Sequence, residues 1–274
     1  MIVDDCQRWT EKRESRRPAG ETIQTSAYEV AAISSPVARA FVETHHYSGT
    51  FSPASHRFGL HERGELVGVA VFGCAPSMAA HRAVFGDLSI TQGVTLGRLV
   101  LLDRVPGNGE SWFVARAFAL LREAGVVAVE SCADPEPRPA ADGKLTHRGH
   151  VGTVYQALNA RYVGRTNAAS LRLLPDGTCL NNRACGKIAR REQGCDYAVA
   201  QLVRWGAETL QADEDALSWL RTWRERLTRP MRHNGNHRYL WCLDKRQRRA
   251  VLDHKPQLAY PKLTVRIDDD RAST

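Results

Sequence analysis

Apolar residues in the middle of the chain change from the pattern of a strand to the pattern of a helix. The run 94–102 (VTLGRLVLL) is rich in Val and Leu and predicts a buried strand. From about 110 to 124, apolar residues recur at spacings of three and four, which predicts a helix. Its apolar stripe is Phe113, Ala117, Leu120, Leu121 and Ala124. The turn between them, 104–109, holds two glycines before a helix start, where unpaired backbone N–H groups suit an anion.

Similar patterns on both sides predict a mixed α+β (α/β-like) fold. Strands are expected at 28–33, 56–60, 66–73, 126–131, 162–165, 170–174 and 236–243, and helices after Ser35-Pro36 and at 151–159, 184–191, 197–205 and 213–227. The stretch 76–93 is expected to be a loop, and the helix after Ser35-Pro36 is expected to turn Val37, Ala40, Phe41 and Thr44 inward. We predict a mobile tail at 1–25, a core at 26–175, a mostly helical, basic insertion or extension with a returning strand at 176–262, and a tail at 263–274.

Composition indicates a folded protein of the cytoplasm. Of 274 residues, 43% are hydrophobic and 25% charged, and no run is long and apolar enough to cross a membrane. The start of the chain lacks the apolar core of a signal peptide. Seven scattered cysteines, none at C-x-x-C spacing, predict reduced thiols. Cys185, Cys195, His233 and His237 match no zinc spacing, and neither do His45, His46, Asp134 and His150, so no metal is predicted.

The net charge of +8 favours a polyanionic partner, and the basic residues concentrate in the stretch 221–249. Four aromatic residues lie among them, which suits phosphate contacts combined with base stacking. The alternative is a solvated helix face whose aromatic side chains belong to the core. The predicted DNA-binding residues are Arg224, Arg232, Arg238, Lys245, Arg246, Arg248 and Arg249, and the interleaved aromatics are Trp219, Trp223, Tyr239 and Trp241.

Three further places carry candidate chemistry. His46 and Tyr47 follow the first helix and suit substrate contacts, although a solvated loop with one packed ring is the simpler interpretation. Arg98 interrupts an apolar strand, so it needs an anionic partner, a cleft or an exposed strand edge. Asp134 follows a strand at the end where open α/β sheets bind ligands, although an aspartate before proline often caps a turn.

The turn Arg104-x-x-Gly107-x-Gly109 fits the pattern Q/R-x-x-G-x-G/A and resembles that of the GNAT acyltransferases, which hold the pyrophosphate of acetyl-coenzyme A there. An ordinary strand-to-helix turn is the alternative. The resemblance implies an acyl-CoA-dependent N-acyltransferase. The implied coenzyme-binding residues are Arg104, Val105, Gly107, Asn108 and Gly109, with Val100 and Leu101 from the preceding strand.

An ordered set of patches over roughly 30–262 is similar to the Mom family of phage DNA-modification proteins, which share the GNAT fold. The patches are 46–49 (HYSG), 66–73 (LVGVAVFG), 96–100 (LGRLV), 111–113 (SWF), 133–135 (ADP), 149–157 (GHVGTVYQA), 237–240 (HRYL) and 260–262 (YPK). One departure is a helical insertion at 175–235 that looks longer than in the best-known members. The resemblance implies a GNAT core with a mixed central sheet, and the pattern of the later residues adds a helical, basic C-terminal extension to it.

The resemblance also implies a function. Such proteins place a small acyl-type group on an exocyclic amine in double-stranded DNA, typically that of adenine, and the product blocks restriction enzymes. Asp134 would serve as base or amine orienter, Tyr155 would protonate the leaving thiolate, Arg98 would hold Asp134 or a phosphate, and His46 and Tyr47 would contact a base outside the duplex. The alternatives are acylation of a hypermodified thymine amine, a protein or a small amine, and a DNA-binding protein with an inactive acyltransferase fold.

Overall fold

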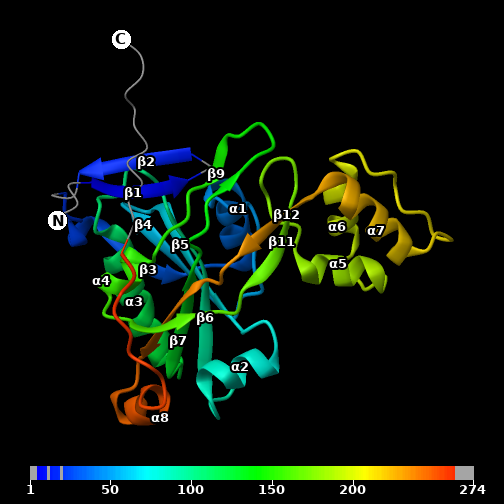
Figure 1. Cartoon of the computed structure of the whole chain (residues 1–274). Coiled ribbons are helices and arrows are strands. Elements are labelled where there is room, and N and C mark those ends of the chain that lie inside the picture. Colours follow the sequence, from blue (N-terminus) through cyan, green and yellow to red (C-terminus); the bar gives the residue numbers. More distant parts are fainter. Residues whose placement is uncertain (1–4, 11–12, 19–20, 263–274) are drawn as a thin grey trace.

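A seven-stranded mixed sheet forms the centre of the molecule, as the sequence predicts. The computed structural model describes residues 5–10, 13–18 and 21–262. The strand order is β10-β13-β7-β6-β5-β4-β3, and only β6 and β7 run parallel (Figure 1). The strands are β3 Tyr28–Ala32, β4 His56–Glu62, β5 Glu65–Gly73, β6 Gly93–Leu101, β7 Ala128–Ala133, β10 Arg161–Arg165 and β13 His237–Cys242.

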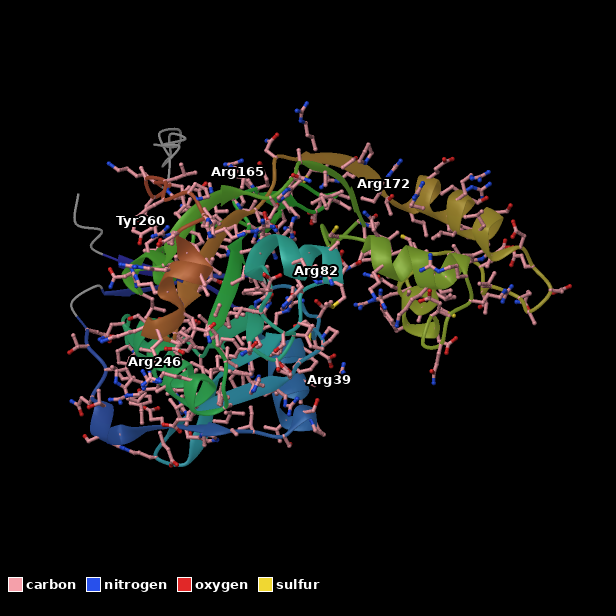
Figure 2. All side chains as sticks on the ribbon, turned by 90° about the horizontal axis from the view of Figure 1, so that it is seen from below. Arg39, Arg82, Arg165, Arg172, Arg246 and Tyr260 are labelled. Atoms are coloured by element: carbon pink, nitrogen blue, oxygen red, sulfur yellow. The ribbon has the colours of Figure 1, made fainter. Side chains whose placement is uncertain are left out.

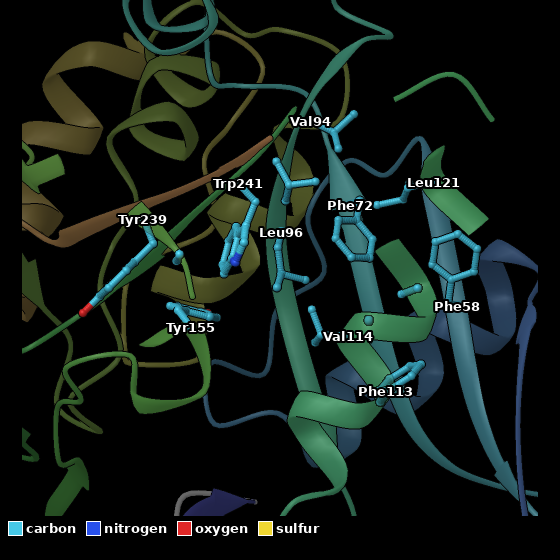
Figure 3. Close-up of a cluster of buried hydrophobic side chains, with 14 of the residues drawn as sticks. Phe58, Phe72, Val94, Leu96, Phe113, Val114, Leu121, Tyr155, Tyr239 and Trp241 are labelled. Carbon is cyan, nitrogen blue, oxygen red and sulfur yellow. The ribbon is translucent and has the colours of Figure 1, made fainter. Parts of the chain in front are cut away.

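Helix α3 (Gly109–Glu123) covers one face of this sheet and α1 (Ser35–His45) covers the other. β5 is buried along almost its whole length because both of its faces are covered, which explains its continuous apolar sequence. Figure 3 shows the core on the α3 side, where Phe113 and Val114 of the helix meet Phe72 and Leu96 of the sheet. The other helices of the core are α2 Met78–Phe85, α4 Thr153–Ala157 and α8 Arg248–Leu252.

Two predictions for the first hundred residues need correction. The stretch 76–93, predicted as a loop, contains α2, whose first turn is capped by the Ser77 hydroxyl accepting from the amide of Ala80. The helix is only eight residues long, and its apolar pattern is too short to show a period. In α1 the buried residues are Ala38 and Val42, whereas Val37, predicted to face inward, is 46% exposed.

The helical segment after residue 175 is an insertion rather than a C-terminal extension. A two-stranded ribbon of β11 (Ala169–Leu173) and β12 (Arg229–His233) leaves the sheet between β10 and β13 and carries a lobe of three helices (Figure 1). These are α5 Asn182–Ala189, α6 Asp196–Val203 and α7 Ala216–Leu227. The lobe has a hydrophobic cluster of its own, which includes Ile188, Leu202 and Trp219. β13 then returns between β7 and β10, so the chain after the lobe completes the central sheet.

The predicted tail at 1–25 contains paired backbone, because β1 (Asp5–Thr10) and β2 (Arg13–Pro18) form an antiparallel ladder. The tail predicted at 263–274 lies outside the described residues. The remaining short elements are η1 Thr25–Ala27, η2 Lys245–Gln247, β8 Arg138–Pro139 and β9 Leu145–His147.

Candidate active site

The two parallel strands separate halfway along their length, and a cavity lies where they part. β6 pairs with β7 only from Gly93 to Leu96, opposite Ala128 to Ser131. Beyond Leu96, β6 stays bonded to β5 but has no partner on the β7 side among the described strands. A cavity of about 240 Å³ is lined by this free half of β6, by Cys132 of β7 and by α4. The polar side chains of its lining are His46, Tyr47, Arg98, Glu110, Cys132, His147, Arg148, His150, Thr153 and Tyr155.

Tyr155 is fixed in the wall of the cavity by the turn that begins α4. Gly152, the residue before the helix, has a φ of 75°, and a Cβ atom there would come within 2.7 Å of the Tyr155 ring. Glycine is therefore required both for the backbone conformation and for the approach of the ring. Burial raises the pKa of Tyr155, and a hydrogen bond with Ser131 opposes that shift. The phenol is therefore protonated at neutral pH, and its O–H can donate either to the Ser131 hydroxyl, which itself donates to the carbonyl of Leu96, or to a ligand in the cavity.

A row of aromatic rings runs along the cavity from His46 to Tyr155. The rings of His46 and Tyr47 lie 4.2 Å apart, and Tyr47 stacks on His147 at 4.7 Å. His150 continues the row, 6.4 Å from His147 and 6.5 Å from Tyr155. The structure thus brings together three of the predicted site residues, His46, Tyr47 and Tyr155, and adds two histidines between them.

Asp134 lies behind this row and does not line the cavity. Its carboxylate forms an ion pair with Arg138, and its Oδ1 atom is 2.9 Å from Nε2 of His233. Only 15% of each side chain of the Asp134–Arg138 pair is exposed. The predicted base is therefore already occupied by a buried guanidinium and an imidazole. Its second oxygen is 3.8 Å from Nε2 of His147, so it can influence the cavity through that ring.

His147 lines the cavity, and both of its ring nitrogens are buried without a hydrogen-bond partner among the described residues. The residue is 4% exposed, and neither ring nitrogen forms a hydrogen bond with any described residue. Burial, followed by the nearby Arg138, lowers the pKa of His147 to about 3. Burial and His237 lower the pKa of His150 to about 4, and burial and Arg98 lower that of His46. All three imidazoles are neutral at pH 7, so each offers one donor and one acceptor.

These buried histidines should make the protein lose stability in mild acid. In the unfolded chain they take up protons below about pH 6.5, whereas in the folded chain His147 and His150 do so only near pH 3 and 4. Each pH unit below 6.5 should therefore cost about 1.4 kcal/mol per histidine until its folded pKa is reached. Urea unfolding at pH 7 and pH 5 measures this loss, and replacement His147→Gln should reduce it. Equal free energies of unfolding at the two pH values would contradict the assignment of neutral, buried rings.

Arg98 is the cationic side chain of the cavity that is best defined by its contacts. Its Nε donates to the carbonyl of Thr50 at 2.8 Å, Nη2 donates to the Thr50 hydroxyl, and Nη1 donates to the carbonyl of Gly97. Arg138, not Arg98, pairs with Asp134, so the structure does not support the predicted contact between Arg98 and Asp134. Two of the five guanidinium N–H groups of Arg98 remain for a ligand.

Cys132 also lines the cavity, yet it is not an activated nucleophile. Burial and the nearby Glu130 raise the pKa of its thiol to about 12. A thiol in that state stays protonated at neutral pH and reacts slowly. The raised pKa therefore disfavours a covalent intermediate on Cys132.

The glycine turn lies beside the cavity, and its predicted coenzyme-binding residues differ in their surroundings. Val100 and Leu101 line the cavity, whereas Val105 is fully buried in the core. Arg104 pairs with Glu62 and Glu65 at the surface, and the Asn108 side chain accepts from the amide of Ile23. A Cβ atom on Gly109 would come 2.5 Å from Val105, so this glycine is needed for packing.

The basic residues predicted to bind DNA do not form one surface. β13 runs antiparallel to β7, so its end at Cys242 lies opposite Ala128, at the end of the sheet away from the cavity. Lys245, Arg246, Arg248 and Arg249 follow at that far end, in η2 and α8. Arg224 lies on α7 of the lobe, Arg232 lies on the ribbon, and Arg238 pairs with Glu130 at 2.7 Å.

The interleaved aromatic residues belong to the cores, not to a stacking surface. Trp219 is 3% exposed in the lobe, and Tyr239 and Trp241 are 0% and 6% exposed in the main core. Figure 3 shows the latter two beside Tyr155. Trp223 packs against the cluster of the lobe as well. For these four residues the alternative interpretation, in which the aromatic side chains belong to the core, is correct.

Sequence reasoning gave no role to His147 and Arg138, and it considered His150 and His233 only as metal ligands. The available signal was the pair of histidines in the short stretch His147-Arg148-Gly149-His150, which lies just before the helix that carries Tyr155. No local pattern could show that His233 reaches Asp134, because 99 residues separate them. Within the described ranges, no three metal-ligating side chains come together, and no helix has the length and hydropathy to cross a membrane.

Comparisons with known proteins give a family match, a related sequence and several solved structures. A model of the Mom protein family matches residues 27–262. The methylcarbamoylase mom of Escherichia phage Mu is 31% identical over 178 residues, which cover 64% of this chain and 68% of that protein. An N-acetyltransferase from Staphylococcus aureus Mu50 has a TM-score of 0.36 at 10% identity, over 79% of this chain and 99% of that one. The yncA protein of Salmonella typhimurium, solved with its cofactor acetyl-CoA, has a TM-score of 0.36 at 9% identity, over 80% and 95%. TM-scores below 0.5 support no functional inference.

Proposed function

The chain belongs to the Mom protein family, and on that premise we propose that it transfers a small acyl-type group to an exocyclic amine of a base in double-stranded DNA. Adenine is the favoured base, and the methylcarbamoyl group of the phage Mu relative is the favoured kind of group. The observation that carries the proposal is the cavity at the separation of β6 and β7, because it places Tyr155, Arg98 and the neutral histidines around one space. The target base would leave the duplex to enter it.

The region beside the cavity fits a coenzyme A donor. Among the described residues, the amides of Gly107 and Asn108 have no hydrogen-bond acceptor, and they stand at the start of α3. Such amides suit a pyrophosphate, and the surface ion pairs of Arg104 cost little to exchange for a phosphate. The free edge of β6 at Val100 and Leu101 can bond the amide-containing arm. When bound, the coenzyme supplies a thioester carbonyl. Glu110 is the one acidic side chain of the described lining, and its negative charge does not favour an anionic coenzyme.

His147 is suited to the acceptor side of the reaction. An exocyclic amine is a weak nucleophile because its lone pair is delocalised into the ring, and its N–H becomes acidic as the new N–C bond forms. The neutral imidazole of His147 can accept a hydrogen bond from that N–H, and because its lowered pKa makes it a weak base, it takes the proton only once the amine nitrogen has become positively charged. Asp134, 3.8 Å from its Nε2, would stabilise the resulting charge and is a positioning residue in this account.

Tyr155 and Arg98 are suited to the donor side of the reaction, where the thioester is cleaved. As the C–S bond breaks, the phenol of Tyr155 donates its hydrogen bond, and then its proton, to the departing sulfur. Arg98 lies close enough to Tyr155 and Tyr47 for their charges to interact. Its two remaining N–H groups can therefore stabilise negative charge on the carbonyl oxygen. His46 and Tyr47 offer a polar edge and an aromatic ring against which a base can stack.

The donor and the acceptor can be tested together with purified protein. Duplex DNA is incubated with acetyl-CoA, with free coenzyme A or without addition, and its resistance to restriction enzymes with adenine in their sites is measured. Protection that requires the acyl donor supports both parts of the proposal. DNA from producing cells that is protected, while the purified protein with acetyl-CoA gives none, would refute acetyl-CoA as donor and keep DNA as acceptor.

A further inference from the structure

We propose that the outward face of the β11–β12 ribbon is the surface that binds duplex DNA and presents it to the cavity. This inference rests on the proposed function and specifies how its substrate is held. It concerns Ser170 and Arg172 of β11 and Arg232 of β12, which we call the ribbon face.

The register of the ribbon decides which side chains point outward. Ala169 pairs with His233, Leu171 with Met231 and Leu173 with Arg229, so these six residues share one face. That face is turned toward the core, because His233 reaches Asp134 and Arg229 donates to the carbonyl of Pro139. Ser170 pairs with Arg232, and Arg172 pairs with Pro230, and these four residues share the other face. Ser170, Pro230 and Arg232 are exposed and Arg172 is half-buried.

The strands that form and support the ribbon are basic and contain no carboxylate. Residues 161–174 and 228–243 include six arginines and neither aspartate nor glutamate. Four of these arginines have partners: Arg161 bonds carbonyls near α8, Arg165 approaches Glu136 at 3.9 Å, Arg229 bonds Pro139, and Arg238 pairs with Glu130. Arg172 and Arg232 have no ion pair with any residue in the described ranges.

The two unpaired guanidinium groups are neighbours on the ribbon face. They occupy diagonal positions across the two strands, where Cα atoms are about 7–8 Å apart. Two like charges at that spacing repel each other in the free protein, and a polyanion relieves the repulsion. A two-stranded ribbon also has the width that the major groove of B-DNA admits. A phosphate backbone therefore fits this face in charge, and the major groove fits the ribbon in width.

The ribbon face is connected to the cavity through a short series of contacts. His233, next to Arg232, is bonded to Asp134, and Asp134 approaches His147 of the cavity lining. His233 and Arg232 point to opposite faces of the ribbon, so a duplex held on the ribbon face would lie at the cavity end of the sheet, with the ribbon between it and Asp134. The denser basic cluster of η2 and α8 lies at the far end of the sheet, and Figure 2 shows Arg172 and Arg246 on well-separated parts of the molecule.

The test compares two double variants that remove the same charge. Arg172→Gln/Arg232→Gln removes the ribbon pair, and Arg246→Gln/Arg249→Gln removes two cations of the far cluster. The affinity for a fluorescent duplex is measured by anisotropy over a series of salt concentrations, and thermal unfolding checks that each variant is folded. The ribbon variant should bind more weakly at every sequence, and its plot of log K against log salt should lose about 2 units of slope. The far variant should keep the wild-type slope.

The outcomes separate the two proposals. If the wild type modifies DNA and the ribbon variant keeps the wild-type slope, the ribbon proposal fails and the proposed function stands. An equal loss of slope in both variants also overturns the ribbon proposal, because the affinity would then depend on the net charge of the protein and not on the position of the arginines. If the wild type neither binds nor modifies DNA, both proposals fail.

Discussion

Replacement of Tyr155 by phenylalanine should lower the rate of base modification about 10²-fold or more, because removal of a general acid typically costs 10²–10⁴-fold. The ring is 8% exposed and packs against Tyr239 and Trp241, and phenylalanine keeps those contacts. Only the hydroxyl group and its hydrogen bond are lost, so the stability should change by about 1 kcal/mol. The rate is measured on duplex DNA by the yield of modified nucleoside, and the stability by urea unfolding.

Tyr260→Phe is the matched control. Its hydroxyl donates to the carbonyl of Ala160 at 2.7 Å, and the residue does not line the cavity. This variant should keep the wild-type rate. A Tyr155→Phe variant that modifies DNA within about threefold of the wild-type rate would show that the phenol is not the general acid, since general-acid contributions are larger than that.

Replacement of Asp134 by asparagine should destabilise the fold by about 3–5 kcal/mol, the usual cost of removing one partner of a buried ion pair. The variant leaves the guanidinium of Arg138, with 15% of its side chain exposed, without a counter-charge. It also alters the hydrogen bond to His233, which holds the base of the ribbon. Chemical denaturation measures the loss.

A double variant shows whether the ion pair is the cause. Asp134→Asn combined with Arg138→Gln removes both charges and should recover much of the lost stability, so the two single effects should not add. The control Glu136→Gln removes a carboxylate that is 3.9 Å from Arg165, whose side chain is 41% exposed, and should cost less than about 1 kcal/mol. If the free energy of unfolding of Asp134→Asn stays at the wild-type value, the buried ion pair with Arg138 does not stabilise the fold and the prediction is wrong.

The elements with a long local period could be predicted from the sequence. The strand, glycine turn and helix from β6 to α3 are where the pattern places them, because each element buries residues at its own spacing. The lobe helices α5, α6 and α7 were also predicted, within a few residues of their bounds. β12, α2 and α8 were not: the inner face of α2 includes the polar His81, and β12 (RPMRH) and α8 (RRAVL) contain few apolar residues.

The site was only partly accessible to such reasoning, because its decisive contacts are long-range. The sequence shows that Asp134 follows a strand, but not that Arg138 and His233 already bind its carboxylate. Likewise, Tyr239 and Trp241 lie in a basic stretch and yet fill the core beside Tyr155, because β13 inserts into the centre of the sheet. Charge density along the chain predicted DNA-binding residues on α7, β12, β13, η2 and α8 alike, and the structure places these elements in different parts of the molecule.

The central claim is that this protein modifies a DNA base in the cavity between β6 and β7. The most direct test is mass spectrometry of nucleosides from DNA of cells that produce the wild type, the Tyr155→Phe variant or the Tyr260→Phe variant. A heavier adenine nucleoside, present with the wild type and Tyr260→Phe and nearly lost with Tyr155→Phe, is the predicted result. Unmodified nucleosides in all three samples, also on DNA that carries an aminated thymine, would contradict it.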